Sequence, residues 1–204
     1  MIEHNQRGVN RLLSIGHSNH SLDIFLKLLK RQEIEVLVDA RSQPYSRFSP
    51  HFNRPALEKA ITNIGIKYLF MGEELGGRPT EDEFYDSEGH VLYARLAESP
   101  QFLEAIARLE TGLGKYRVAL LCSEEDPTNC HRRLLVSRVL ATRGISVNHI
   151  RGDGRIETEK ELQAKEGRLR DRGQKSLFAS QEENVWRSIQ SVSQRGRRQS
   201  SSRH

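Results

Sequence analysis

The amino-acid sequence predicts an α/β protein with a mostly parallel sheet of about five strands. Three observations lead to this fold class. Short apolar runs alternate with longer stretches that have the apolar spacing of amphipathic helices. No Pro-, Gly- or Ser-rich linker interrupts residues 10–152. The 204 residues, 36% of them hydrophobic, are enough for one ordinary domain with a small appendage.

Five short apolar runs predict the strands. They span residues 12–16, 35–40, 66–71, 117–122 and 145–150. Four stretches with helical spacing lie between them, over residues 22–32, 55–65, 100–114 and 131–144. Ser21 and Ser99 suit N-cap positions, and Pro55 and Pro100 suit the first turn of a helix. Strands that alternate with helices of this length predict a three-layer, Rossmann-like domain over residues 10–152.

The segment over residues 72–90 is expected to be a long loop, rich in Gly and acids. Neither G-x-G-x-x-G nor G-x-x-x-x-G-K-[ST] occurs in the right setting, so no nicotinamide or P-loop role is expected. Gly76 and Gly77 predict a turn with positive φ that directs Arg78 towards the strand ends. The composition of this loop suits a mobile lid.

The positive charge lies at the end of the chain. Residues 1–154 carry as many acids as bases, and so do residues 155–186. The net charge of +5 therefore belongs to residues 187–204, which hold five arginines and no acid. A helical extension over 153–190 is expected to pack on or near the domain, and 191–204 to form a disordered Arg/Ser-rich tail. Such a tail either screens the phosphates of nucleic acid or is merely a solvated terminus.

The cellular setting is inferred from what the sequence lacks. No run approaches the roughly 20 apolar residues that a membrane-spanning helix needs, and no secretory signal is visible. Two cysteines in such a chain are expected to be free thiols or ligands rather than a disulfide. We therefore expect a cytoplasmic protein without a membrane partner.

Reactive side chains gather in the loops that follow four of the predicted strands. In an open parallel sheet, ligands bind beyond the carboxyl ends of the strands. The four loops read GHSNHS, DARSQPYSRF, GEELGGRP and CSEEDPTNCHRR. We expect them to form one site from these residues: His17, Asn19, Asp39, Arg41, Ser46, Arg78, Cys122, Glu124, Cys130, His131 and Arg132.

Four motifs resemble those of the domain-of-unknown-function 488 (DUF488) family. They are IGHSNHSLDIF, VLVDARSQPYSRF, ELGGRP and LLCSEEDPTNCHRRLL, which together cover about residues 12–150, and KSLFASQEENVW is similar to the family's C-terminal Leu-Phe segment. Asp-Ala-Arg stands where Asp-Val-Arg is common in the family, a change that a strand end should tolerate. The resemblance implies the α/β fold and the place of the site, but no reaction. It places these residues at motif positions: Gly16, His17, Ser18, Asp39, Arg41, Pro44, Ser46, Gly76, Gly77, Tyr93, Cys122, Glu124, Cys130, His131 and Arg132.

Cys122 is the first candidate for chemistry. It ends a strand, and the next helix would direct its positive N-terminal end, with His131 and Arg132, at a thiolate there. Such a cysteine is a nucleophile, and the pattern is similar to rhodanese and cysteine-phosphatase domains. The acids Glu124, Glu125 and Asp126 would however repel phosphate or sulfate and raise the thiol pKa. The structural alternative is that the cysteines are small buried apolar groups.

A metal site is the second hypothesis for these residues. Cys122, Cys130 and His131 offer sulfur and imidazole ligands, with Asp39 or His17 from the neighbouring strand ends. The spacing Cys-x(7)-Cys-His matches none of the common zinc patterns. No cofactor is therefore predicted, and a divalent metal is kept as an alternative.

The third hypothesis gives the chemistry to carboxylates. Glu124 and Asp39 then act as acid or base or bind a sugar hydroxyl, while arginines and His17 bind phosphate. Asp39 and Arg41 alternatively form an ion pair that fixes two loops. Aromatic side chains can stack a base or simply pack, and the candidates are Tyr45, Phe48, Phe52 and Tyr93.

These features favour an enzyme, a hydrolase or transferase, that acts on a nucleotide, a nucleic acid or another anionic substrate. The expected catalytic residues are Cys122, Glu124, His131 and Arg132. The expected substrate-binding residues are His17, Ser18, Asn19, Asp39, Arg41, Ser46, Arg78 and Tyr93. Two alternatives remain open: a non-catalytic nucleotide or nucleic-acid binding module, and a thiol-based, rhodanese-like sulfur or redox protein. The oligomeric state is not predicted.

Overall fold

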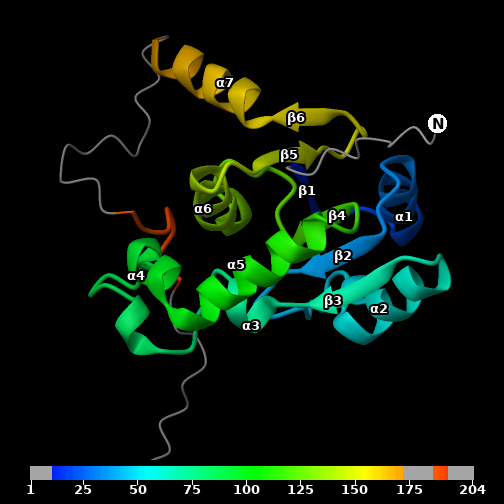
Figure 1. The fold of residues 1–204 in the computed structure, drawn as a ribbon, viewed down its shortest axis with the longest axis horizontal. Helices are drawn as coiled ribbons and strands as arrows, with labels where there is room; N and C mark the ends of the chain where they lie inside the picture. Colours follow the sequence, from blue (N-terminus) through cyan, green and yellow to red (C-terminus); the bar gives the residue numbers. More distant parts are fainter. Residues whose placement is uncertain (1–10, 172–185, 193–204) are drawn as a thin grey trace, which may run out of the picture.

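A six-stranded sheet forms the centre of the protein (Figure 1). The computed structural model describes residues 11–171 and 186–192. Within these residues the strands lie in the order β3-β2-β4-β1-β5-β6; β1 to β5 run parallel, and β6 is antiparallel to β5. The bounds are β1 (Arg11–Gly16), β2 (Val36–Asp39), β3 (Lys67–Phe70), β4 (Val118–Cys122), β5 (Ser146–Ile150) and β6 (Ile156–Thr158).

Helices cover both faces of the sheet, which confirms the predicted three-layer, Rossmann-like arrangement. Phe25 of α1 and Leu57 of α2 belong to the core on one face. Phe102 of α5, Leu96 of α4 and Leu140 of α6 belong to the core on the other. The helices are α1 (Leu22–Arg31), α2 (Arg54–Asn63), α3 (Gly72–Leu75), α4 (Tyr93–Glu98), α5 (Pro100–Leu113), α6 (Arg138–Thr142) and α7 (Glu159–Asp171), with short 3-10 turns η1 (Pro50–Phe52) and η2 (Asp82–Phe84) and a π-helical segment η3 (Arg132–Ser137).

Local capping explains where two of the predicted helices begin. The Ser21 side chain accepts a hydrogen bond from the backbone N–H of Ile24 at the start of α1. The Ser99 side chain does the same for Phe102 in α5, and Pro100 occupies the first turn. These contacts satisfy backbone donors that a helix leaves without partners at its N-terminus. The predicted starts of both helices are therefore confirmed.

Two segments differ from the prediction. The expected loop over 72–90 contains α3 and η2, and α4 follows directly after it. Each of these is only one or two turns long, too short for an apolar period to show in the sequence. The strand β6 was not expected either. It has three residues, one of them the buried Glu157, and it forms because β5 offers a free edge.

The C-terminal part of the chain contains the predicted helical extension as α7, which follows β6 (Figure 1). Most of the predicted tail lies outside the described residues, but its first two residues are described. Ser191 donates to the carbonyl of Glu88 at 2.7 Å, and the N–H of Val192 donates to the carbonyl of Gly89 at 2.8 Å. Among the described residues, no helix is both long enough and apolar enough to cross a membrane.

Candidate functional site

Two cysteines, a histidine and a glutamate meet at the carboxyl end of β4. Cys122 is the last residue of the strand, and Cys130 and His131 lead into η3. The two Sγ atoms lie 3.1 Å apart. Glu124 Oε2 lies 2.8 Å from Cys122 Sγ and 3.0 Å from Cys130 Sγ. One donor atom from each of the four side chains lies within 4.8 Å of the others, so the structure brings together residues predicted for this loop.

His131 is held so that one ring nitrogen faces the two sulfurs. Its Nε2 lies 3.1 Å from the carbonyl oxygen of Ala40, so Nε2 is the donor, and when the ring is neutral Nδ1 is the acceptor. Nδ1 lies 3.6 Å from Cys122 Sγ and 4.0 Å from Cys130 Sγ. Gly77 packs against the ring, since a Cβ there would lie 2.7 Å from His131 Cγ. The lone pair of Nδ1 is thus directed into the cluster.

A buried arginine shapes the loop that carries Glu124. Arg132 has no exposed surface, and its NH1 group donates to the carbonyl of Glu124 and, at 3.3 Å, to Cys130 Sγ. Its NH2 group donates to the carbonyl of Glu125 at 2.7 Å. The same loop packs on Gly16, where a Cβ would lie 1.7 Å from the Glu124 carbonyl oxygen. The guanidinium therefore serves mainly to fix backbone, and its predicted catalytic role stays a prediction.

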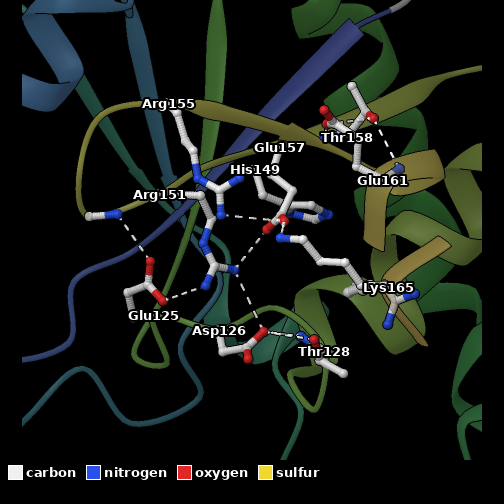
Figure 2. Close-up of polar contacts among 12 residues, drawn as sticks. Glu125, Asp126, Thr128, His149, Arg151, Arg155, Glu157, Thr158, Glu161 and Lys165 are labelled. Carbon is white, nitrogen blue, oxygen red and sulfur yellow. Dashed lines mark hydrogen bonds and ion pairs between the residues drawn. The ribbon is translucent and has the colours of Figure 1, made fainter. Parts of the chain in front are cut away.

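An ion-pair network ties this loop to the edge of the sheet (Figure 2). The side chain of Arg151, just after β5, lies 2.8 Å from Glu125 Oε2. It also lies 3.2 Å from an oxygen of Glu157, which is buried on β6. Arg155 and Lys165 contact the other oxygen of Glu157. The unpredicted strand β6 thus anchors the loop of the candidate site.

Charge within the cluster is distributed unevenly between the two thiols. Burial opposes ionisation of Cys122, but the hydrogen bond from Cys130 and the positive charge of His131 and Arg132 outweigh it. The pKa of Cys122 therefore lies well below the usual value. Burial and the neighbouring sulfur raise the pKa of Cys130 well above the usual value. Burial lowers the pKa of His131, but the effect of Cys122 and Glu124 is larger and opposite, so the pKa of His131 is raised overall.

Asp39, at the end of β2, forms a buried ion pair with Arg41. The two side chains make paired contacts of 2.8 Å and 2.6 Å, and Arg41 also donates to the carbonyl of Phe52 at 2.9 Å. The Tyr68 hydroxyl of β3 donates to the same carboxylate at 2.5 Å. Burial and the adjacent Asp39 charge raise the pKa of Tyr68. This geometry matches the ion-pair alternative, in which the pair fixes the loops after β2.

The loop after β1 brings three predicted residues to the same edge. His17 is buried, and its ring stacks on Phe52. Its backbone N–H donates to the carbonyl of Cys122 at 3.1 Å. Its Nδ1 lies 2.8 Å from the carbonyl of Ser18, so Nε2 keeps its lone pair. Burial and a nearby guanidinium lower the pKa of His17 to about 4, so the ring is neutral near pH 7. The Ser18 hydroxyl donates to Asn19 Oδ1 at 3.4 Å.

Ser46, Arg78 and Tyr93 occupy different surroundings. The Ser46 hydroxyl accepts the backbone N–H groups of Phe48 and Ser49, both at 3.2 Å, and thereby shapes its own loop. Arg78 is exposed. Tyr93 is buried, and burial together with the negative charge of the cysteines and the glutamate raises its pKa. Its phenol therefore lies beside the cluster, while the substrate-binding role of all three stays a prediction.

Gly76 and Gly77 do not have the positive φ that the sequence suggested. Gly76 has a φ of −67°, and the described glycines with positive φ are others. The expectation was wrong because these positions need space rather than a special backbone. A Cβ on Gly76 would lie 2.2 Å from the Gly72 carbonyl oxygen and 2.2 Å from Ser42 Oγ.

Comparison with known proteins gives one match. The family model described as "Domain of unknown function DUF488" matches residues 21–139, more than half of the chain. The chain belongs to the DUF488 family. No curated protein and no solved structure matches it.

The DUF488 match contains the whole cluster of two cysteines, Glu124 and His131, and also the Asp39–Arg41 pair. His17 precedes the matched residues, and the anchoring Arg151 and Glu157 follow them. Two contributions were missed by sequence reasoning. Tyr68 looked like an ordinary strand aromatic, and the Ala40 carbonyl that orients His131 is backbone, which leaves no trace in the sequence.

Proposed function

We propose that this DUF488 protein is a metal-dependent hydrolase, with a divalent cation held by Cys122, Cys130 and His131. One observation carries the proposal: two sulfurs, an imidazole nitrogen and a carboxylate oxygen converge within 4.8 Å. Sulfur and imidazole donors together favour zinc among the abundant divalent ions. The unusual spacing Cys-x(7)-Cys-His is no obstacle, because the loop folds back to bring the ligands together.

The charge of the cluster supports a cation. Two thiol sulfurs and the Glu124 carboxylate oxygen lie within 3.1 Å of one another. Without a metal they must share protons, because three adjacent negative charges repel. A divalent cation replaces those protons and stabilises thiolate and carboxylate together. Neighbouring guanidinium groups stabilise these negative charges only partly, since Arg132 mainly contacts backbone carbonyls and Arg41 is paired with Asp39.

The orientation of His131 also supports metal binding. Histidine ligands commonly donate their second ring nitrogen to a carbonyl or carboxylate, which fixes the tautomer and the ring. In this chain Nε2 donates to Ala40, and Nδ1 faces the sulfurs. The N–H of Arg132 that reaches Cys130 Sγ is a second contact of this kind, because it stabilises a thiolate ligand.

The residues of the cluster differ in their exposure to solvent. Cys122 is 3% exposed and Cys130 is 2% exposed, whereas Glu124 is an exposed residue. A catalytic zinc usually keeps three protein ligands and one exchangeable position. We assign Glu124, the exposed member of the cluster, as the group whose carboxylate would take a proton from water.

The chemistry follows from these assignments. Cys122, Cys130 and His131 would hold the zinc ion, which would supply a Lewis acid to polarise water or a substrate oxygen. Glu124 accepts a proton from the attacking water, the water oxygen forms a bond to the electrophilic atom of the substrate, and the leaving group departs with the proton returned by Glu124. Atoms and charge balance without a redox partner. Neutral His17 and the buried Tyr93 lie beside this centre, where they can orient the substrate.

Elemental analysis of the full chain, purified without chelator, tests the proposal. We expect about one zinc per chain and loss of most of it in Cys130→Ser, because serine is a weak zinc ligand. Glu104→Gln, which alters an exposed carboxylate on α5, is the control and should keep the metal. Circular dichroism checks that each variant is folded.

Hydrolysis of bis(p-nitrophenyl) phosphate supplies the second readout. Glu124→Gln should keep zinc and lose about 100-fold or more in turnover, since it retains shape but cannot accept a proton. Absence of stoichiometric metal in the native chain, or full zinc occupancy in Cys130→Ser, would overturn the proposal.

A thiol redox role is the second candidate, and the 3.1 Å separation of the sulfurs is what favours it. Two thiols and one hydrogen peroxide give one disulfide and two waters, with Cys122 attacking as thiolate and Cys130 resolving. Mass spectrometry after peroxide treatment distinguishes the two. A metal-loaded hydrolase should resist this oxidation until zinc is removed, whereas a redox protein should lose the mass of two hydrogen atoms at once.

A further inference from the structure

A loop beside the candidate site exposes two large aromatic side chains. Tyr45 is 75% exposed and Phe48 is 82% exposed, the largest values among the large hydrophobic residues that the structure describes. Both lie between β2 and α2, at the carboxyl edge of the sheet. Phe52, in the same loop, is fully buried, so the sequence's four candidate stacking aromatics divide into packed and exposed ones.

The backbone of this loop is held in place, so the exposure is built into the fold. The N–H of Ser46 donates to Asn53 Oδ1 at 2.6 Å, and the Ser46 hydroxyl accepts from the residues after it. The N–H of Arg54 donates to the carbonyl of Pro44 at 2.9 Å, which closes the loop at its base. Two rings presented on a fixed loop lose little entropy when they bind a flat partner.

Arginines accompany the exposed rings. Residues 40–57 contain no acid. The guanidinium of Arg47 lies 4.7 Å from the centre of the Phe48 ring. That of Arg54 lies 4.1 Å from the centre of the Phe70 ring, at the end of β3. Both arginines are exposed, so the surface offers stacking faces and positive charge side by side.

We infer that this surface, formed by Tyr45, Arg47, Phe48 and Arg54, binds single-stranded nucleic acid. Aromatic rings stack on unpaired bases, and arginines nearby neutralise the phosphates between them. In a duplex the base faces are stacked inside and cannot contact the rings. A purely apolar partner would leave the positive charge of Arg47 and Arg54 without a counter-charge. The loop therefore fits a single strand best.

The same loop connects this surface to the candidate site. Arg41, at its start, is paired with Asp39 and donates to Phe52, and Phe52 stacks on His17. The Ala40 carbonyl, one residue earlier, orients His131. That the bound single strand is also the substrate rests on the proposed function. That this surface binds a single strand does not.

Fluorescence anisotropy with a labelled 12-nucleotide oligothymidylate and the full chain tests the inference. We expect the double variant Tyr45→Ala/Phe48→Ala to bind about tenfold or more weakly, because stacking is lost at two rings. Tyr116→Ala is the matched control. Tyr116 is 38% exposed and lies under Lys67, but it stands at the opposite edge of the sheet, before β4. Its variant should bind within about twofold of the native chain.

Salt dependence gives an independent readout. Arg47→Gln should reduce the slope of log K against log salt by about 0.7, the value for one lost phosphate contact on a single strand. The C-terminal arginines are present in every variant, so any contribution from them is the same throughout. Equal affinity of the double variant and the native chain would overturn the inference, because binding would then depend on those arginines alone.

Three further arms separate other occupants and the proposed function. The chain should not co-sediment with phosphatidylglycerol vesicles in a way that depends on Tyr45 and Phe48. If it does, and the oligonucleotide does not bind, the partner is a membrane and the inference fails. Competition by free thymidine monophosphate at equal nucleotide concentration would also overturn it. Cys130→Ser should lose zinc but keep oligonucleotide affinity, and the double variant should do the reverse, so failure of one proposal is seen apart from failure of the other.

Discussion

Gly77 allows the imidazole of His131 to approach the loop before α4, and a methyl group there tests how much the cluster depends on it. In Gly77→Ala the new Cβ would lie 2.7 Å from His131 Cγ and 2.8 Å from its Cβ, so the ring must move. We expect a zinc affinity at least about tenfold lower, the usual effect of disturbing the support of a ligand. Competition with a fluorescent chelator measures it.

Gly112→Ala is the control for that experiment. A Cβ on Gly112 of α5 meets nothing within 4 Å, so this variant should keep its zinc affinity. It should also gain about 0.5–1 kcal/mol of unfolding free energy, because alanine is the better residue inside a helix. Unchanged zinc affinity in Gly77→Ala would show that the ring has room to move.

The buried Asp39 carboxylate is the next residue whose role can be isolated. Its partners are Arg41 and Tyr68. Asp39→Asn leaves the guanidinium of Arg41 buried without a counter-charge, and we expect a loss of about 3 kcal/mol or more in the free energy of unfolding. Tyr68→Phe removes one hydrogen bond and should cost about 1–2 kcal/mol. Urea denaturation monitored by circular dichroism measures both.

An exposed ion pair provides the comparison. Glu110→Gln breaks its contact with Arg143, in which both side chains are about one-third exposed, and should change stability by less than about 1 kcal/mol. If Asp39→Asn were no more destabilising than Glu110→Gln, the pair would not be what fixes the loops after β2.

At the scale of elements, sequence reasoning succeeded where a local signal exists. Five strands were apolar enough to recognise, and Ser21 and Ser99 marked two helix starts by their capping side chains. It failed where tertiary contacts decide. The strand β6 carries a charged residue, Glu157, in the middle of its three, and only the free edge of β5 makes it a strand.

Helix α7 is attached to the domain by carboxylates, which makes its docking depend on pH. Arg133 of η3 contacts Glu159 at 2.7 Å and Glu166 at 2.8 Å, and His149 lies 3.7 Å from Glu159. Burial opposes ionisation of Glu159, but His149 and Arg133 outweigh it and lower its pKa to about 2. Because the folded pKa lies below the ordinary value of 4.5, this contribution to stability is complete above that pH.

We therefore expect α7 to detach progressively as the pH falls from about 4.5 towards 2. Hydrogen exchange of the α7 amides at pH 5 and pH 2.5 measures it. Glu159→Gln should remove most of the difference between the two conditions, whereas Glu104→Gln, an exposed carboxylate on α5, should leave it unchanged. Burial lowers the pKa of the neighbouring His149, which opposes protonation of its ring.

At the scale of the whole molecule, the place of the site follows from the topology. Parallel strands end at the same edge, so loops far apart in the sequence had to meet there. That is why the positions of Cys122, His131 and Asp39 could be predicted. Their roles could not, because distances decide them: Arg41 and Arg132 looked like anion-binding groups, yet most of their donors contact Asp39 and backbone carbonyls.

The last described residues, 186–192, pack back onto the domain and support the side of the cluster that holds Tyr93. Trp186 Nε1 donates to the carbonyl of Leu134 at 2.7 Å, its carbonyl accepts the N–H of Ala94 at 3.2 Å, and Arg138 lies over its ring. The rings of Trp186 and Tyr93 meet edge to face with centroids 6.4 Å apart. The segment thus connects η3 and α4.

Removing that ring should loosen both elements at once. We expect Trp186→Ala to lower the free energy of unfolding by about 2–3 kcal/mol, less than a fully buried tryptophan because this one is half-buried. Arg187→Ala is the control, since Arg187 is exposed and its ion pairs are with Asp86 and Glu88 at the surface, and it should cost much less stability than Trp186→Ala. Because Tyr93 lies beside the cysteines, Trp186→Ala should also weaken zinc binding. A variant that lost stability but kept full zinc affinity would show that the C-terminal segment supports the fold without shaping the site.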